Sequence, residues 1–196
     1  MIICVTDRLS CQGDFLEHIE QIAKALPYSI ILREKDLQLQ EYEKLALEAS
    51  RICYRYNVPL VVNSHISVAK KIKVSNIHLP MEIFLKQRDE LSVFKKIGVS
   101  VHSFEEAKLA EGMGADYIIA GHIFLTDCKK GVPPRGLDFL KMICSEVAIP
   151  VYAIGGINHN NINAVLKCGV TGICLMSQLM KCDSPAEVIN RYHTFF

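Results

Sequence analysis

The chain contains 196 residues, half of them hydrophobic, and its 22 basic and 21 acidic residues leave a formal net charge of +1. This length predicts a single domain over residues 1–196 with a continuous core. The near-neutral balance, without a basic tail, argues against a nucleic-acid partner, and no apolar stretch is long enough to predict a membrane span. The eight cysteines form no Cys-x-x-Cys pair and lie mostly in apolar runs, which predicts buried thiols in a reducing cytoplasm.

In the first half of the chain, short apolar segments rich in β-branched residues alternate with segments whose apolar residues recur at helical spacing. We expect strands at residues 2–5, 29–32, 59–62 and 76–79. Helices are expected at residues 14–26 and 40–56, around residues 68–69, and after Pro80.

The same alternation continues in the second half, with strands expected at residues 97–101, 117–120, 150–154 and 171–175. Ser103, followed three residues later by Glu106, predicts a capping box at the start of a helix. Further helices are expected over residues 137–144, through residues 162–166 with Asn158 as the N-cap, and from Ser184, where Pro185 suits the first turn.

Eight strands that alternate with helices, and that are apolar throughout, predict a parallel sheet covered on both faces. The number of units favours a compact α/β fold of the (β/α)₈ TIM-barrel type. An open doubly wound sheet is the alternative. It is disfavoured because no glycine-rich nucleotide fingerprint precedes the first expected helix.

Polar residues follow almost every expected strand, and in a closed barrel these positions meet at one mouth, where such folds place their active sites. Gly155 and Gly156 follow the seventh strand, while Met176 and Ser177 follow the eighth, which is the recurrent phosphate-binding position. Ordinary turn glycines are the alternative. We favour phosphate binding because of their place in the barrel.

The loop over residues 121–136 carries the side chains best suited to chemistry. His122, beside a glycine, is a candidate for proton transfer, although a lone histidine is more often structural. Thr126 and Lys129, together with Lys130 and Arg135, are expected either to form a basic flap over a phosphate or to remain a solvated charge run.

Arg33 and Lys35 flank Glu34 at the end of the second strand, so one or both side chains can point into the mouth. A solvated charge run is the alternative. Three histidines, His65, His78 and His102, lie on different strands without short ligand spacing, so no metal site is predicted from them.

Six motifs resemble those of thiamin phosphate synthase and its relative, the TenI thiazole tautomerase, over nearly the whole chain. They are Leu32-Arg-Glu-Lys-Asp36, Val61-Val-Asn63, Ser100-Val-His-Ser103 with Glu105-Glu106-Ala107, Gly114-Ala-Asp-Tyr117, Ala153-Ile-Gly-Gly-Ile157 and Gly172-Ile-Cys-Leu-Met-Ser177. The resemblance implies a thiamin-phosphate-synthase-like barrel that binds a thiazole phosphate, with Asn63 and Ser103 among its ligand-binding residues.

The two branches differ in their metal-binding carboxylates. The synthase typically has Asn-Asp after the third strand and Gly-Gln-x-Asp after the fourth, whose aspartates hold magnesium. This chain has Asn63-Ser64 and Leu79-Pro-Met-Glu-Ile83 at those places. His122 and the following Thr126-Asp-Cys-Lys-Lys-Gly131 look like the tautomerase branch instead.

The expected function is therefore a thiazole tautomerase, an isomerase that needs no cofactor or metal. His122 would transfer the proton; Gly155, Gly156, Met176 and Ser177 would hold the phosphate, and the charges of Arg33, Lys35 and Lys129, with Thr126, would meet the ligand. Thiamin phosphate synthase, with magnesium held by unusual ligands such as Glu82, is the first alternative, and a non-catalytic binder of thiazole phosphate or thiamin phosphate is the second. A homodimer is also expected.

Overall fold

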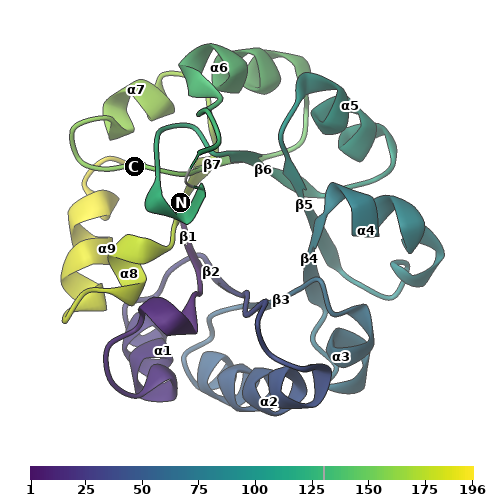
Figure 1. Ribbon diagram of the computed structural model, residues 1–196, viewed down its shortest axis with the longest axis vertical. Helices are drawn as coiled ribbons and strands as arrows, with labels where there is room; N and C mark the ends of the chain where they lie inside the picture. The colour runs from purple at the N-terminus through teal and green to yellow at the C-terminus, as the bar shows by residue number, and fades with distance from the viewer. Residues whose placement is uncertain (130) are drawn as a thin grey trace.

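The computed structural model describes residues 1–129 and 131–196 and forms a closed barrel of eight parallel strands, each paired with the next and β8 with β1 (Figure 1). The expected (β/α)₈ fold is confirmed. The strands are β1 (Ile2–Val5), β2 (Ser29–Leu32), β3 (Leu60–Asn63), β4 (Asn76–Pro80), β5 (Lys96–Val101), β6 (Tyr117–Gly121), β7 (Val151–Ile154) and β8 (Gly172–Leu175).

Helices form a ring outside the strands (Figure 1). They are α1 (Phe15–Lys24), α2 (Leu39–Arg55), α3 (Ile66–Lys71), α4 (Met81–Lys86), α5 (Phe104–Gly112), α6 (Gly136–Glu146), α7 (Ile162–Leu166), α8 (Ser177–Met180) and α9 (Pro185–His193). Short 3₁₀ turns add η1 (Arg8–Ser10), η2 (Arg88–Glu90) and η3 (Asp127–Lys129). Within the described residues, no helix combines the length and the apolar character needed to cross a membrane.

The strands are apolar throughout because both of their faces are buried. Successive side chains alternate between the barrel interior and the helix layer. The interior cluster contains Ile3, Val5, Ile31, Val61, Tyr117, Ile119, Tyr152 and Cys174, while the larger cluster packs between strands and helices. The cysteines only partly match the expectation of burial, because Cys128 is exposed on the β6–α6 loop.

Two local features differ from the sequence prediction. The N-cap of α7 is Asn161 and not Asn158, because the Asn158 side-chain oxygen accepts the Asn160 N–H at 2.9 Å and closes a preceding turn. Helix α8 was not predicted at all. Its four residues, Ser177–Met180, are too few to show a helical repeat of apolar positions.

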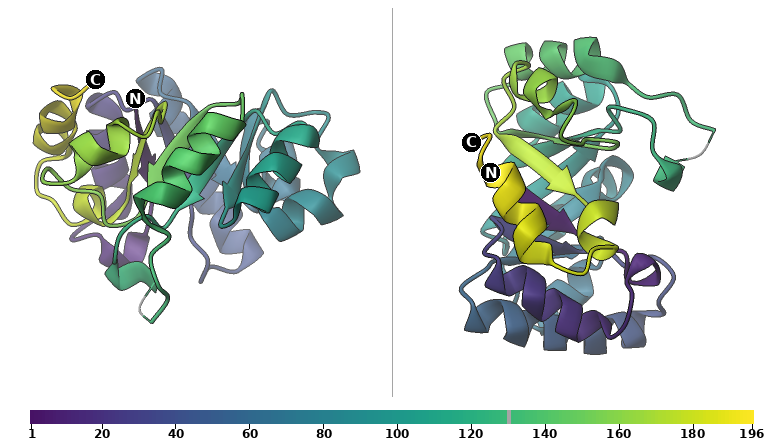
Figure 2. Two further views of the ribbon diagram at one scale, coloured as in Figure 1. Left: turned by 90° about the horizontal axis from the view of Figure 1, so that it is seen from above. Right: turned by 90° about the vertical axis from the view of Figure 1, so that its left-hand side faces the viewer.

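The β6–α6 loop extends beyond the carboxyl ends of the strands, on the face opposite the chain termini (Figure 2). Its base is closed by two backbone bonds, from Arg135 N–H to the His122 carbonyl at 2.9 Å and from Gly136 N–H to the Ile123 carbonyl at 3.0 Å. This closure places the loop residues at the rim of the barrel mouth.

Candidate active site

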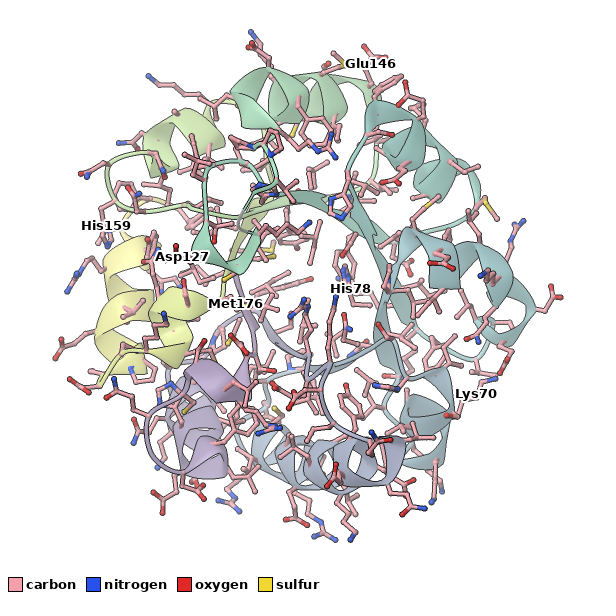
Figure 3. All side chains as sticks on the ribbon, viewed as in Figure 1. Lys70, His78, Asp127, Glu146, His159 and Met176 are labelled. Atoms are coloured by element: carbon pink, nitrogen blue, oxygen red, sulfur yellow. The ribbon has the colours of Figure 1, made fainter. Side chains whose placement is uncertain are left out.

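A cavity of about 1120 Å³ opens at the carboxyl ends of the strands, and all eight strands contribute to its lining. This is the face at which barrel enzymes carry their active sites. Figure 3 shows the labelled His78, Met176 and Asp127 toward the middle of the ring, whereas Lys70 and Glu146 lie at its periphery. The convergence predicted from polar strand ends is therefore present.

Most residues expected at the site line this cavity. They are Arg33, Lys35, Asn63, His122, Thr126, Lys129, Gly155, Gly156, Met176 and Ser177. Ser103 does not belong to the lining. Its hydroxyl accepts the Glu106 N–H at 3.1 Å and caps α5, as the sequence predicted, and its contact with a ligand stays a prediction. Lys130, expected in the flap, lies outside the described residues.

Positive charge predominates in the cavity lining, where Arg33, Lys35, Lys129 and Lys181 face only two carboxylates, those of Asp7 and Asp127. None of these four cations forms an ion pair with a carboxylate among the residues that the structure describes. Such a concentration of one charge sign attracts anionic ligands.

The cations also act on one another. The charge of Arg33, followed by burial, lowers the pKa of Lys35. Burial, followed by the charges of Arg135, Lys35 and Arg33, lowers the pKa of Lys129. Positive charges from the β2 end and from the β6–α6 loop therefore lie close together in the same cavity. An anion bound between them would relieve their repulsion.

His122 is 3% exposed, and its Nε2 donates to the Val132 carbonyl at 3.2 Å, across the β6–α6 loop. Its backbone packs directly on the next loop, because a Cβ built at Gly155 would lie 2.3 Å from the His122 Cβ. Gly155 and Gly156 also have positive φ values of 103° and 65°. These two positions therefore require glycine both for conformation and for the close approach of the two loops.

His102 was noted at a strand end but given no role by the sequence. Its Nδ1 lies 2.5 Å from the Gly121 carbonyl, which assigns the N–H to Nδ1, and Lys129 Nζ lies 3.5 Å from its Nε2. Burial is the main cause that lowers the pKa of His102, so the neutral ring accepts from Lys129. The sequence also missed Gln178 and Lys181, which line the cavity from the unpredicted α8 and its end.

His78 forms part of the cavity floor, with its ring stacked on Tyr117 at a centroid distance of 5.7 Å. Its Nε2 lies 2.7 Å from the Ser100 hydroxyl, and its Nδ1 is buried without a hydrogen-bond partner. Burial lowers its pKa to about 3, so the ring is neutral near pH 7.

The family model described as thiamine monophosphate synthase matches residues 2–179. The chain belongs to this family. A thiamine-phosphate synthase from Fusobacterium nucleatum is 35% identical over 91% of this chain and 88% of its own length, and one from Clostridium novyi is 37% identical over 91% and 90%. A solved structure of a thiamine phosphate pyrophosphorylase from Pyrococcus furiosus aligns with a TM-score of 0.84 at 29% identity, covering 98% of this chain and 93% of that one.

These family relatives support an enzyme but overturn the expected thiazole tautomerase, because relatives spanning about nine-tenths of the chain are named synthases. The isomerase prediction was wrong. It depended on the presence of His122 and on the absence of the two metal-binding aspartates expected in a synthase after the third and fourth strands. In the structure the His122 Nε2 is hydrogen-bonded to the Val132 carbonyl of its own loop, and the residue also lines the cavity.

Proposed function

We propose that the chain is a thiamine-phosphate synthase. In the reaction that the resemblance implies, the bond between hydroxymethylpyrimidine and its pyrophosphate breaks, a bond between the pyrimidine and thiazole phosphate forms, and pyrophosphate leaves. Both substrates are small phosphorylated molecules. The proposal is carried chiefly by family membership together with the positively charged cavity at the barrel mouth.

Pyrophosphate is assigned to the side of the cavity formed by the β2 end and the β6–α6 loop. Arg33, Lys35 and Lys129 line that side and have no carboxylate partner among the described residues. A multiply charged leaving group gains most from cations that are already in place when its charge develops. Asn63 and Thr126 line the same cavity and supply uncharged hydrogen-bonding groups.

The phosphate of the thiazole substrate is assigned to Gly155, Gly156, Met176 and Ser177. These residues follow β7 and β8, and Ser177 begins the short α8. Loops after the seventh and eighth strands, with the first turn of a short extra helix, form the recurrent phosphate site of this fold. The missing side chains of Gly155 and Gly156 make room for the β6–α6 loop, and their positive φ values shape the turn that follows β7.

The residues do not match a carboxylate-held magnesium ion at the positions implied by the family. The Asn63 side-chain amide donates to the Ser64 hydroxyl at 2.8 Å, and the Glu82 carboxylate lies on the surface, 2.7 Å from Lys86 Nζ. Residues 1–129 and 131–196 contain no group of three or more His, Cys, Asp or Glu side chains arranged to hold a metal. We therefore assign compensation of the pyrophosphate charge to the protein's own cations.

Incubation of the purified protein with hydroxymethylpyrimidine pyrophosphate and thiazole phosphate tests the proposal. Mass spectrometry should detect thiamin phosphate and pyrophosphate in equal amounts, at a rate proportional to enzyme concentration. Parallel reactions with magnesium and with a chelator test the assignment of charge compensation. Absence of product in both would refute the synthase. If a thiazole phosphate still raised the melting temperature, the non-catalytic binder would replace it.

The expected homodimer also stays a prediction. Light scattering on the purified protein would test it, with a mass near twice the 22.0 kDa of the chain expected for a dimer.

A further inference from the structure

The side chains of the four residues after β2 point in turn toward the cavity and toward the loop that follows β1. Arg33 and Lys35 line the cavity. Glu34, between them, is 3% exposed, and its carboxylate accepts hydrogen bonds from the Thr6 hydroxyl at 2.5 Å and from the Arg8 N–H at 2.9 Å. Asp36 forms an ion pair with the Arg8 guanidinium. Each acidic residue is therefore bound to the β1 loop, away from the neighbouring cations.

Thr6 connects the two strands through one hydroxyl group. It is fully buried, and its Oγ1 accepts the Arg33 N–H at 2.9 Å while donating to Glu34. Its own N–H donates to the Ile31 carbonyl at 3.0 Å, which continues the β1–β2 pairing past the end of the strands. The backbone of Arg33 and the side chain of Glu34 are thus held by the same residue.

This arrangement determines which way the Arg33 and Lys35 side chains point. Because side chains alternate along an extended segment, fixing Glu34 toward the β1 loop directs Arg33 and Lys35 to the opposite side. It also keeps the Glu34 carboxylate from pairing with either neighbour, so both cations remain available to an anion. Burial raises the pKa of Glu34, and the hydrogen bonds from Thr6 and Arg8 oppose this shift.

We propose that Thr6 and Glu34 are positioning residues that hold Arg33 and Lys35 in place to bind the pyrophosphate group. We call the four residues Thr6, Glu34, Arg33 and Lys35 the clamp. The inference rests on the proposed function for the identity of the substrate, but binding by the clamp requires only a pyrophosphate anion as ligand. Neither Thr6 nor Glu34 contacts that anion; both act through the β2 end.

Three variants test the clamp. Thr6→Val keeps the shape of the side chain but removes the hydroxyl, Thr6→Ser restores the hydroxyl, and Glu34→Gln removes the charge and one acceptor. Calorimetry should show inorganic pyrophosphate binding about tenfold more weakly to Thr6→Val than to the wild type, since about 1.4 kcal/mol corresponds to a factor of ten. Thr6→Ser should recover most of this loss, and Glu34→Gln should bind weakly as well.

Thiazole phosphate binding, which is assigned to the far side of the cavity, distinguishes positioning from general damage. We expect its affinity to change less than about twofold in all three variants, a difference of about 0.4 kcal/mol. In the synthase assay, the KM for the pyrimidine pyrophosphate should rise while the KM for thiazole phosphate stays constant. A parallel loss of both affinities would overturn the proposal, because it would indicate a distorted barrel.

The outcomes for the clamp and for the synthase are separable. If the wild type binds pyrophosphate but makes no thiamin phosphate, the synthase fails while the clamp is still judged by the Thr6→Val and Thr6→Ser pair. Unchanged pyrophosphate affinity in a folded Thr6→Val, or no pyrophosphate binding by the wild type, would refute the clamp. Should Thr6→Val not fold, Glu34→Gln provides the same comparison.

Discussion

The buried His78 makes the stability of the protein depend on pH in a direction that can be calculated. Burial lowers its pKa from 6.5 to about 3. Between these two values the unfolded chain binds a proton that the folded chain does not, so the free energy of unfolding falls as the pH falls. This contribution to stability is fully present above pH 6.5 and is lost progressively toward pH 3.

The magnitude follows from the span of pH that is crossed. Each unit below the unfolded-state pKa costs about 1.4 kcal/mol, so a change from pH 7 to pH 5 should remove about 2 kcal/mol through His78 alone. Burial also lowers the pKa of His65 and is the main cause that lowers that of His102, so these two histidines should contribute to the loss in the same direction.

Urea unfolding at pH 7 and pH 5, without ligand, isolates the effect. His78→Gln removes the titrating ring but keeps a hydrogen-bonding group toward Ser100, so its loss of stability between the two pH values should be about 2 kcal/mol smaller than in the wild type. His193→Gln, which replaces an exposed histidine of α9, is the matched control. If both variants keep the wild-type pH dependence, burial of a neutral His78 is not its source.

Three further predictions concern packing, charge and metal. Gly98→Ala should lower the free energy of unfolding by about 1–3 kcal/mol in urea titrations, because the added Cβ would lie 2.0 Å from the Tyr117 ring. Gly112→Ala, whose Cβ meets open space, should lower the free energy of unfolding less. Equal losses in the two variants would contradict this packing argument. Lys129→Met should raise the KM for the pyrophosphate substrate and reduce its sensitivity to salt in steady-state assays, whereas an unchanged salt response would exclude this lysine from pyrophosphate binding. Glu82→Gln should leave the synthase rate and its response to magnesium unaltered, because the Glu82 side chain is 76% exposed on α4. A changed response to magnesium would show that Glu82 is a metal ligand.

Much of the fold is encoded in local patterns. The first two strands occur at the predicted bounds, and Ser184 caps α9 with Pro185 in its first turn, because apolar runs, capping hydroxyls and proline act over a few neighbouring residues. The four-residue α8 escaped prediction because it is held by its place after β8 and carries no repeat of its own.

The sequence by itself determined the (β/α)₈ barrel and the presence of polar groups at its mouth, since apolar strands and their polar ends follow one another in order. Which side chain enters the cavity was decided only by the tertiary structure. His102 lines it, while the adjacent Ser103 caps a helix, because the His102 ring is held by the Gly121 carbonyl of the neighbouring strand. Glu34 likewise turns from the cavity because Thr6, 28 residues earlier, supplies its hydrogen bond. Such directions depend on partners that only the closed barrel brings together.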